Sequence, residues 1–244
     1  MIDQETIQNI RINVQDFWDE LVKDPDFVKK IRDSKEKEAG HQIADWVDRR
    51  TTGFLSSKYF TLFQYDKQGK ELIRSMGDIW LEYKEIYHPI NVKTGVSSSK
   101  EGMPNMVSLK KVLDALLNFQ IDSYYLLMIK FKVESTIEST VYFVDMLDYL
   151  QYVGFDSGPG QIMLKAKNFF TMMSSSATPE KLSMKQKVKK LFDILKDGER
   201  RLVINRRKDL DEYKKLVNVF ESVANLTVTP ETQKALNLRV RNSV

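Results

Sequence analysis

The most regular alternation of apolar and polar positions lies between residues 77 and 94. Residues 77–83 alternate, with Ile79, Leu81 and Tyr83 on one face and Asp78, Trp80 and Glu82 on the other, which predicts a half-buried strand. Residues 86–94 extend again after a two-residue turn. If the two strands pair as a hairpin, the polar faces bring Asp78, Asn91 and Lys93 into one small space at the edge of a sheet.

A helical period governs the two ends of the chain. Residues 4–50 repeat apolar positions at helical spacing, with a break at Asp24-Pro25, and residues 178–226 do so again. In the second region we expect Thr178 to cap a helix, Pro179 to take the first helical position and Gly198 to interrupt the helix.

Shorter segments fill the middle of the chain. Strands are predicted at residues 59–65, 71–74, 124–133, 140–144 and 162–165, helices at 106–117 and 146–153, and loops at 51–58 and 95–104. Residues 124–133 carry too few polar side chains for an exposed strand, so we expect them in the interior of the sheet.

These elements predict one mixed α/β domain over residues 1–244. It would have a helical N-terminal part (1–50), a sheet core (51–170) and a basic helical C-terminal part (178–226), followed by a tail. No internal repeat or linker divides the sequence.

Composition removes several classes of function. The chain has 244 residues, 42% of them apolar and 30% charged, as in a soluble globular protein. It has no cysteine, which excludes disulfides and thiolate metal sites, and its two histidines leave little for a zinc site or a serine–histidine triad. We find no secretory signal and no bilayer-spanning run, and we expect a cytoplasmic protein.

Positive charge is concentrated in one segment. Residues 180–215 hold 13 Lys and Arg against 7 Asp and Glu, a net charge of +6, whereas the rest of the chain has a net charge of −2. A localised basic region of this kind suits a polyanionic partner.

The polar residues of the predicted hairpin suit one kind of chemistry. The oxygens of Asp78 and Asn91 are ligands for a hard divalent cation such as Mg²⁺. A metal ion of this kind polarises a phosphoryl oxygen, and Lys93 can orient or deprotonate an attacking water. The combination points to hydrolysis of a phosphodiester.

The same residues resemble a known family. Gly77-Asp78, followed by Ile90-Asn91-Val92-Lys93-Thr94, is similar to the core of PD-(D/E)xK nucleases, and more narrowly of Type II restriction endonucleases. The close resemblance covers about residues 70–120. It implies a restriction-endonuclease-like fold and Mg²⁺-dependent cleavage of double-stranded DNA at a short sequence, leaving 5′-phosphate ends. It also implies that Asp78 ligates the metal, that Asn91 is a weak ligand and that Lys93 positions the water, with the Val92 carbonyl as a further ligand.

Asn91 departs from the family pattern, which has Asp or Glu at this place. Three explanations stay open: a natural asparagine variant, a carboxylate that has moved to Glu82, Glu85 or Glu38, or an inactivated protein. Glu38 and Asp45 lie on the predicted helix that precedes the sheet, where a solvated helix face is the simpler role.

Further residues are candidates for DNA contacts. The polar loop after Lys93 and the glycine-rich loop at residues 154–161 suit a close approach to DNA. The glycine-rich loop lacks the Gly-Lys-Ser/Thr ending of an ATP-binding loop, so we do not expect it to bind ATP. The predicted DNA-binding residues are Ser97, Ser98, Ser99, Lys100, Asn105, Gln161, Lys165, Arg200, Arg201, Arg206 and Arg207. A homodimer would suit a palindromic site.

Three other functions remain open at this stage. The chain is alternatively a DNA-binding protein that keeps the nuclease fold without cleavage, which Asn91 favours, or a nuclease of DNA repair or of a mobile element. The third alternative is a helical interaction protein in which the hairpin is incidental; such a protein would have no affinity for DNA.

Overall fold

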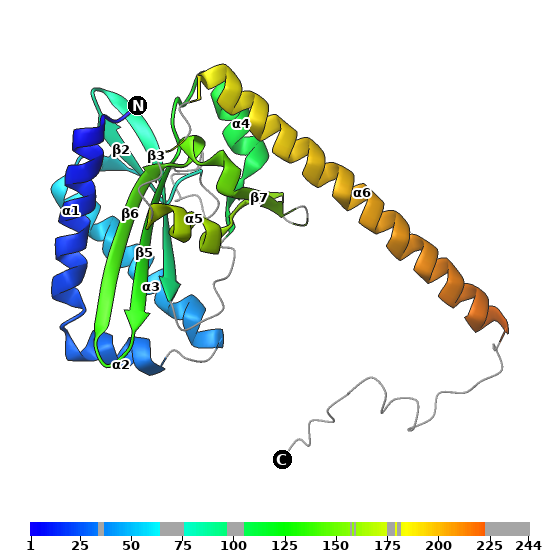
Figure 1. Ribbon diagram of the computed structural model, residues 1–244, viewed down its shortest axis with the longest axis horizontal. Helices are drawn as coiled ribbons and strands as arrows, with labels where there is room; N and C mark the ends of the chain where they lie inside the picture. Colours follow the sequence, from blue (N-terminus) through cyan, green and yellow to red (C-terminus); the bar gives the residue numbers. More distant parts are fainter. Residues whose placement is uncertain are drawn as a thin grey trace, which may run out of the picture. The chain divides into compact units, whose positions relative to one another are not determined.

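The computed structural model describes residues 1–33, 37–63, 76–96, 105–156, 158, 160–174, 179 and 182–222. The chain forms two compact units, Met1–Glu199 and Arg200–Val244. In the first, helices and strands build a mixed α/β fold (Figure 1). None of the described helices is long and apolar enough to cross a membrane.

The main sheet has five strands in the order β1-β2-β3-β5-β6: β1 (Thr61–Leu62), β2 (Ile79–Tyr83), β3 (Ile86–Val96), β5 (Tyr125–Val133) and β6 (Ile137–Asp145). Strands β3 and β5 are parallel and the other neighbours are antiparallel. The predicted hairpin is confirmed as β2 and β3, and β5 lies in the interior of the sheet as its composition predicts.

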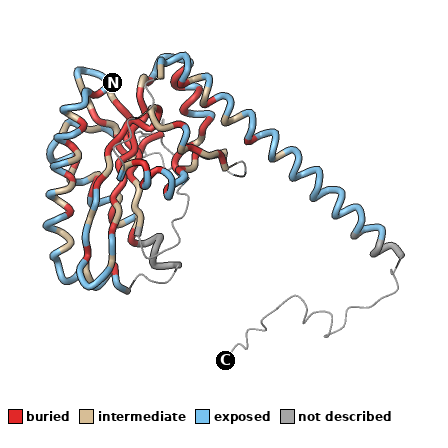
Figure 2. The backbone as a smooth tube through the Cα atoms, viewed as in Figure 1, coloured by how far each residue is buried: buried red, intermediate tan, exposed pale blue. Residues whose placement is uncertain are grey.

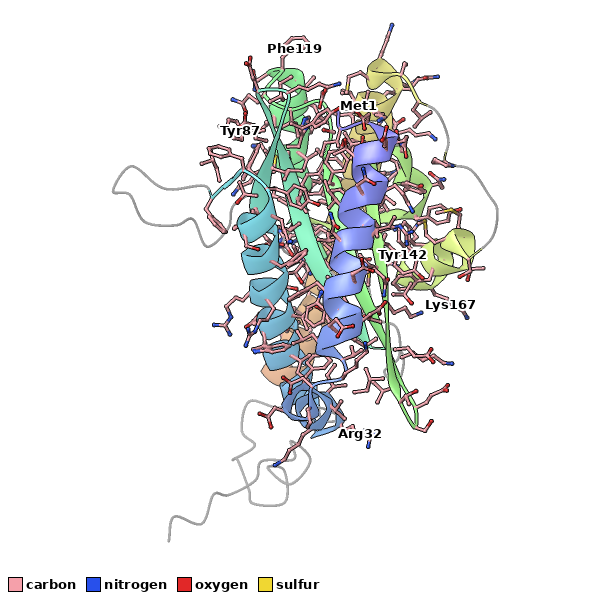
Figure 3. The ribbon with its side chains drawn as sticks, turned by 90° about the vertical axis from the view of Figure 1, so that its left-hand side faces the viewer. Met1, Arg32, Tyr87, Phe119, Tyr142 and Lys167 are labelled. Carbon is pink, nitrogen blue, oxygen red and sulfur yellow. The ribbon has the colours of Figure 1, made fainter. Side chains whose placement is uncertain are left out.

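Three helices cover one face of this sheet: α1 (Gln4–Leu21), α2 (Pro25–Asp33) and α3 (Lys37–Lys58). Figure 3 shows α1 and α3 side by side across the strands. The α1 helix begins after Asp3, whose side chain accepts a hydrogen bond from the amide of Thr6. Its apolar stripe, which includes Trp18, packs against the strands.

The predicted loop at residues 51–58 is wrong, because α3 continues to Lys58. Val47, Thr51 and Leu55 form one buried stripe at helical spacing. The Thr51 hydroxyl donates to the carbonyl oxygen of Val47 (2.8 Å) and accepts a hydrogen bond from the indole of Trp18 (3.2 Å). Packing therefore keeps the Thr-Thr-Gly segment at residues 51–53 helical, although its composition is typical of a loop.

The opposite face carries a small antiparallel sheet of order β4-β8-β7, formed by β4 (Asn105–Ser108), β8 (Gln161–Leu164) and β7 (Val153–Asp156). Helices α4 (Leu109–Leu117) and α5 (Ala166–Met173) and the first part of α6 (Met184–Ser222) pack here around a second core (Figure 2). Two short 3₁₀ turns, Met146–Asp148 and Leu150–Tyr152, occupy the predicted short helix.

The prediction that residues 106–108 belong to the helix that follows is wrong, because they lie in β4 (Asn105–Ser108). They form β4 because Ser108 caps α4: its side chain accepts a hydrogen bond from the amide of Lys111, so the helix begins at Leu109.

Helix α6 begins later than predicted and is not interrupted at Gly198. The side chains of Ser183 and Gln186 accept each other's amide hydrogens in a capping box, which starts the helix at Met184 rather than at Pro179. At Gly198 a Cβ atom would lie 1.8 Å from the ring of Phe155. The glycine therefore permits close packing instead of breaking the helix.

Some predicted elements lie outside the described residues. These are the strand at 71–74, residues 64 and 65 of the one at 59–65, the polar loop from residue 97 to 104, and the tail after residue 226.

Candidate active site

The site begins where β2 starts and β3 continues beyond it, paired with β5 but no longer with β2. A Cβ atom at Gly77 would lie 2.9 Å from the backbone nitrogen of Ile90, so a glycine is required for the close approach of the two chains. The amide of Asp78 donates to the carbonyl oxygen of Ile90 (2.8 Å), which fixes the position of Asp78 at the end of the hairpin.

The Asp78 carboxylate replaces a strand partner for the edge of β3. The last backbone pair of β2 and β3 joins Ile79 and Ile90. Two residues later, the amide of Val92 donates to Asp78 Oδ2 at 2.7 Å. The N–H and C=O of one strand residue point to the same side, so the Val92 carbonyl faces this same edge.

Lys93 is next to Asp78, as the sequence predicts. Its Nζ atom lies 3.8 Å from Asp78 Oδ2, and its side chain is only 19% exposed. Asn91 and Lys93 alternate along β3 with the buried residues Ile90 and Val92, so these two side chains share the other face of the strand. The structure thus brings Lys93 next to Asp78 and places Asn91 on the same strand face as Lys93.

Three buried polar atoms on this face have no hydrogen-bond partner among the described residues: Asn91 Oδ1, the Tyr124 hydroxyl oxygen and Trp80 Nε1. Asn91 is 3% exposed and Tyr124 is fully buried. Leaving such a group unpaired costs about 1–3 kcal/mol, and native proteins retain few of them. The Tyr124 hydroxyl is close enough to Asp78 for the charge of Asp78 to act on it, so these atoms are candidates for hydrogen bonds to a polar ligand.

The charge of Asp78 affects the pKa of the Tyr124 hydroxyl. Burial raises the pKa of its hydroxyl well above the ordinary value, and the negative charge of Asp78 raises it further. The hydroxyl therefore stays protonated and is a hydrogen-bond donor at the site.

A second carboxylate, Asp48, reaches the site from α3. Its Oδ1 atom accepts a hydrogen bond from the Thr94 hydroxyl at 3.2 Å, at the same end of β3. Burial raises the pKa of Asp48 to about 7; the charge of Lys93 opposes this shift and that of Asp78 adds to it. Asp48 is therefore within the electrostatic range of both Asp78 and Lys93.

Sequence reasoning missed Asp48. The one signal for it is its place at the border of the buried stripe of α3, directly after Val47, where an acid is unusual. The proximity of Asp48 to Thr94 results from the packing of α3 on β3.

Two of the acids that the sequence offered as substitutes for Asn91, Glu82 and Glu85, do not fill this role. Glu82 lies four residues along β2 from Asp78, roughly 13 Å away, where it accepts a hydrogen bond from Tyr87. Glu85 is exposed in the hairpin turn, Asp45 is exposed on α3, and the side chain of Glu38 lies outside the described residues.

The chemical type of the available ligand atoms suits a hard cation. Asp48, Asp78, Asn91 Oδ1 and the Val92 carbonyl supply only oxygen atoms, as Mg²⁺ prefers, and Asn91 Oδ1 is an acceptor without a partner in the described part of the chain. Within that part, no group of three or more His, Cys, Asp or Glu is placed to hold a metal ion. A cation here would thus take much of its shell from water and phosphate.

The predicted DNA-binding residues fall into three sets. Asn105 and Gln161 lie on the paired strands β4 and β8, where Asn105 donates to Asp156 (3.3 Å), and exposed Lys165 follows β8 directly. Arg200, Arg201, Arg206 and Arg207 are exposed on α6 in the second unit. Ser97, Ser98, Ser99 and Lys100 lie outside the described residues.

No protein-family model matches the chain, and no curated protein matches it. The proposed function therefore rests on the chemistry of the site.

Proposed function

We propose that this chain is a Mg²⁺-dependent endonuclease that hydrolyses phosphodiester bonds of double-stranded DNA, with a restriction-endonuclease-like core. One observation carries the proposal. Beyond the end of its pairing with β2, β3 carries Lys93, which lies 3.8 Å from Asp78, and the charges of both residues act on a second carboxylate, Asp48; the same strand carries Asn91, whose buried amide oxygen has no described partner.

Each residue has a part in this proposal. Asp78, Asp48 and Asn91 Oδ1, with the Val92 carbonyl, would hold Mg²⁺, which supplies Lewis-acid polarisation of the phosphate. Lys93 is placed to position the attacking water or to take its proton. The hydrogen bond from the Val92 amide to Oδ2 restrains the Asp78 carboxylate, as an outer-shell hydrogen bond does for a metal ligand.

The substrate assignment follows the resemblance of residues 70–120 to Type II restriction endonucleases. Cleavage at a short sequence by a homodimer in the cytoplasm is the form of activity that this resemblance supports. The exposed basic residues Lys165, Arg200, Arg201, Arg206 and Arg207 would contact phosphates.

The test is cleavage of plasmid and phage DNA by the purified protein with Mg²⁺ and with EDTA. We expect discrete fragments that depend on Mg²⁺. Asp78→Asn is expected to abolish them, whereas Asp26→Asn, a matched change of an exposed acid on α2, is expected to leave them intact. Cleavage that survives Asp78→Asn would overturn the proposed site.

A second candidate is a DNA-binding protein with the same fold but without cleavage, and the uncharged Asn91 is the observation that favours it. Asn91→Asp separates the two. Discrete fragments from the wild type mean that an amide suffices at this position. Fragments only from Asn91→Asp mean an inactive relative of such enzymes. No cleavage by either protein, with salt-dependent DNA binding retained, supports the binding protein.

A further inference from the structure

The second unit exposes an apolar stripe along α6. Val203, Leu210, Tyr213 and Val217 are between 49% and 67% exposed, although each is a large apolar side chain. Their spacing of seven, three and four residues is the 3.5-residue period of a coiled-coil seam, with Arg206 in the one remaining position.

Nothing within the described part of this unit covers the stripe. Among the described side chains of residues 200–222, none is buried. A helix with one apolar stripe obtains most of its stability from packing that stripe against another element, and an isolated helix in water is marginal. The helix is therefore expected to pack this apolar stripe against a partner.

The charges beside the seam select the partner and its direction. Asp209 directly precedes the seam residue Leu210, and Lys214 directly follows Tyr213. If Leu210 is at heptad position a and Tyr213 at d, Asp209 is at position g and Lys214 at position e of the next heptad. In a parallel pair of identical helices these g and e positions face each other, so Asp209 is next to Lys214 of the partner subunit, and symmetry repeats the pair. An antiparallel pair would instead place Arg207 near Lys214 of the partner subunit, which is repulsive.

We propose that residues 203–217 of α6 form a parallel two-stranded coiled coil with a second copy of this chain. The seam residues supply the apolar contact, and the Asp209–Lys214 pairs set the register and the parallel direction. Arg206 occupies a seam position at some cost in stability, as polar seam residues do when they restrict the partner and the register. This inference does not depend on the proposed cleavage.

The test uses the full-length chain and two charge reversals, with molecular mass measured by sedimentation equilibrium at low salt. The wild type is expected to be a dimer. Asp209→Lys and Lys214→Asp each convert both attractive pairs to repulsive ones, so each variant alone is expected to raise the dimer dissociation constant about tenfold or more. An equimolar mixture of the two variants restores opposite charges in both pairs, and it is expected to regain the dimer.

The matched control is Lys208→Asp, on the outer side of the same helix, which is expected to leave the dissociation constant unchanged within about twofold. A wild type that stays monomeric at tens of micromolar overturns the proposal. So does a dimer that neither reversal weakens, because it must use another surface. A mixture no tighter than the single variants excludes the parallel arrangement.

Discussion

Replacing Asp48 by asparagine is expected to stabilise the folded protein at pH 8 while weakening the activity proposed for its site. Asparagine has nearly the same shape and keeps an oxygen that accepts the hydrogen bond from Thr94. The substitution therefore removes the charge of Asp48 with little change in packing.

The size and sign of the effect follow from the raised pKa. Burial raises the pKa of Asp48 from 3.8 to about 7, against the attraction of Lys93. Between pH 4 and pH 7 the folded state holds a proton that the unfolded state releases, so stability is lost as the pH rises through this range and is level above it. At 1.36 kcal/mol per pKa unit, the charged carboxylate lowers the free energy of unfolding by up to about 4 kcal/mol at pH 8.

Guanidinium unfolding in EDTA at pH 4.5 and pH 8 measures this difference. The free energies of unfolding of wild type and Asp48→Asn are expected to be close at pH 4.5, with the variant more stable by about 2–4 kcal/mol at pH 8. Asp45→Asn, an exposed acid on the same helix, is expected to change stability by less than about 0.5 kcal/mol at either pH. If Asp48→Asn is destabilising at pH 8, or the gap does not widen with pH, the assigned environment of Asp48 is wrong.

Three further changes test the packing around the site. Gly77→Ala is expected to lower stability by about 1–3 kcal/mol and to abolish cleavage, since its Cβ atom meets the Ile90 backbone at 2.9 Å and displaces Asp78; normal cleavage would refute this. Lys187→Met is expected to cost about 3–5 kcal/mol at pH 8, because Lys187 Nζ lies 3.3 Å from the buried carboxylate of Asp145. The loss is expected to be smaller at pH 5, since burial raises the pKa of Asp145 to about 6, and a pH-independent loss would contradict the account. Glu85→Gly is expected to stabilise the hairpin by about 0.5–1 kcal/mol in thermal unfolding, because Glu85 has φ of 64°; a lower melting temperature would be the opposite result.

The hairpin that carries the site was predictable because its signals are local. Alternation sets the faces of both strands, and the two-residue turn sets the register, with Tyr83 opposite Ile86. That register brings the start of β2, directly after Asp78, opposite Ile90, one residue before Asn91 and three before Lys93. The proximity of Asp78 and Lys93 is thus written in the sequence from 77 to 94.

Asp48 was not predictable in the same way. It comes from α3, and its partner Thr94 is 46 residues away in the sequence. The contact depends on how the helix layer packs at the edge of the sheet, which no local period specifies. The same cause explains the error at residues 51–58, where burial of Thr51 and Leu55 outweighs low helix propensity.

Gly198 shows a further limit of local reading. A glycine in a helical pattern indicates a break when its surroundings are unknown. Here the ring of Phe155 occupies the space of the missing side chain, so the glycine serves packing between segments distant in the sequence. A glycine is required at this position because of a tertiary contact, which the local sequence does not reveal.

The most direct measurement of the central claim is the single-turnover rate of DNA cleavage by wild type and Lys93→Ala with saturating Mg²⁺. The account predicts a rate at least about 10²-fold lower for Lys93→Ala, with little change in DNA affinity, because the lysine acts on the attacking water. Lys23→Ala, a matched change at an exposed position between α1 and α2, is expected to cleave at the wild-type rate. Cleavage by Lys93→Ala at the full rate would contradict the assignment of this site.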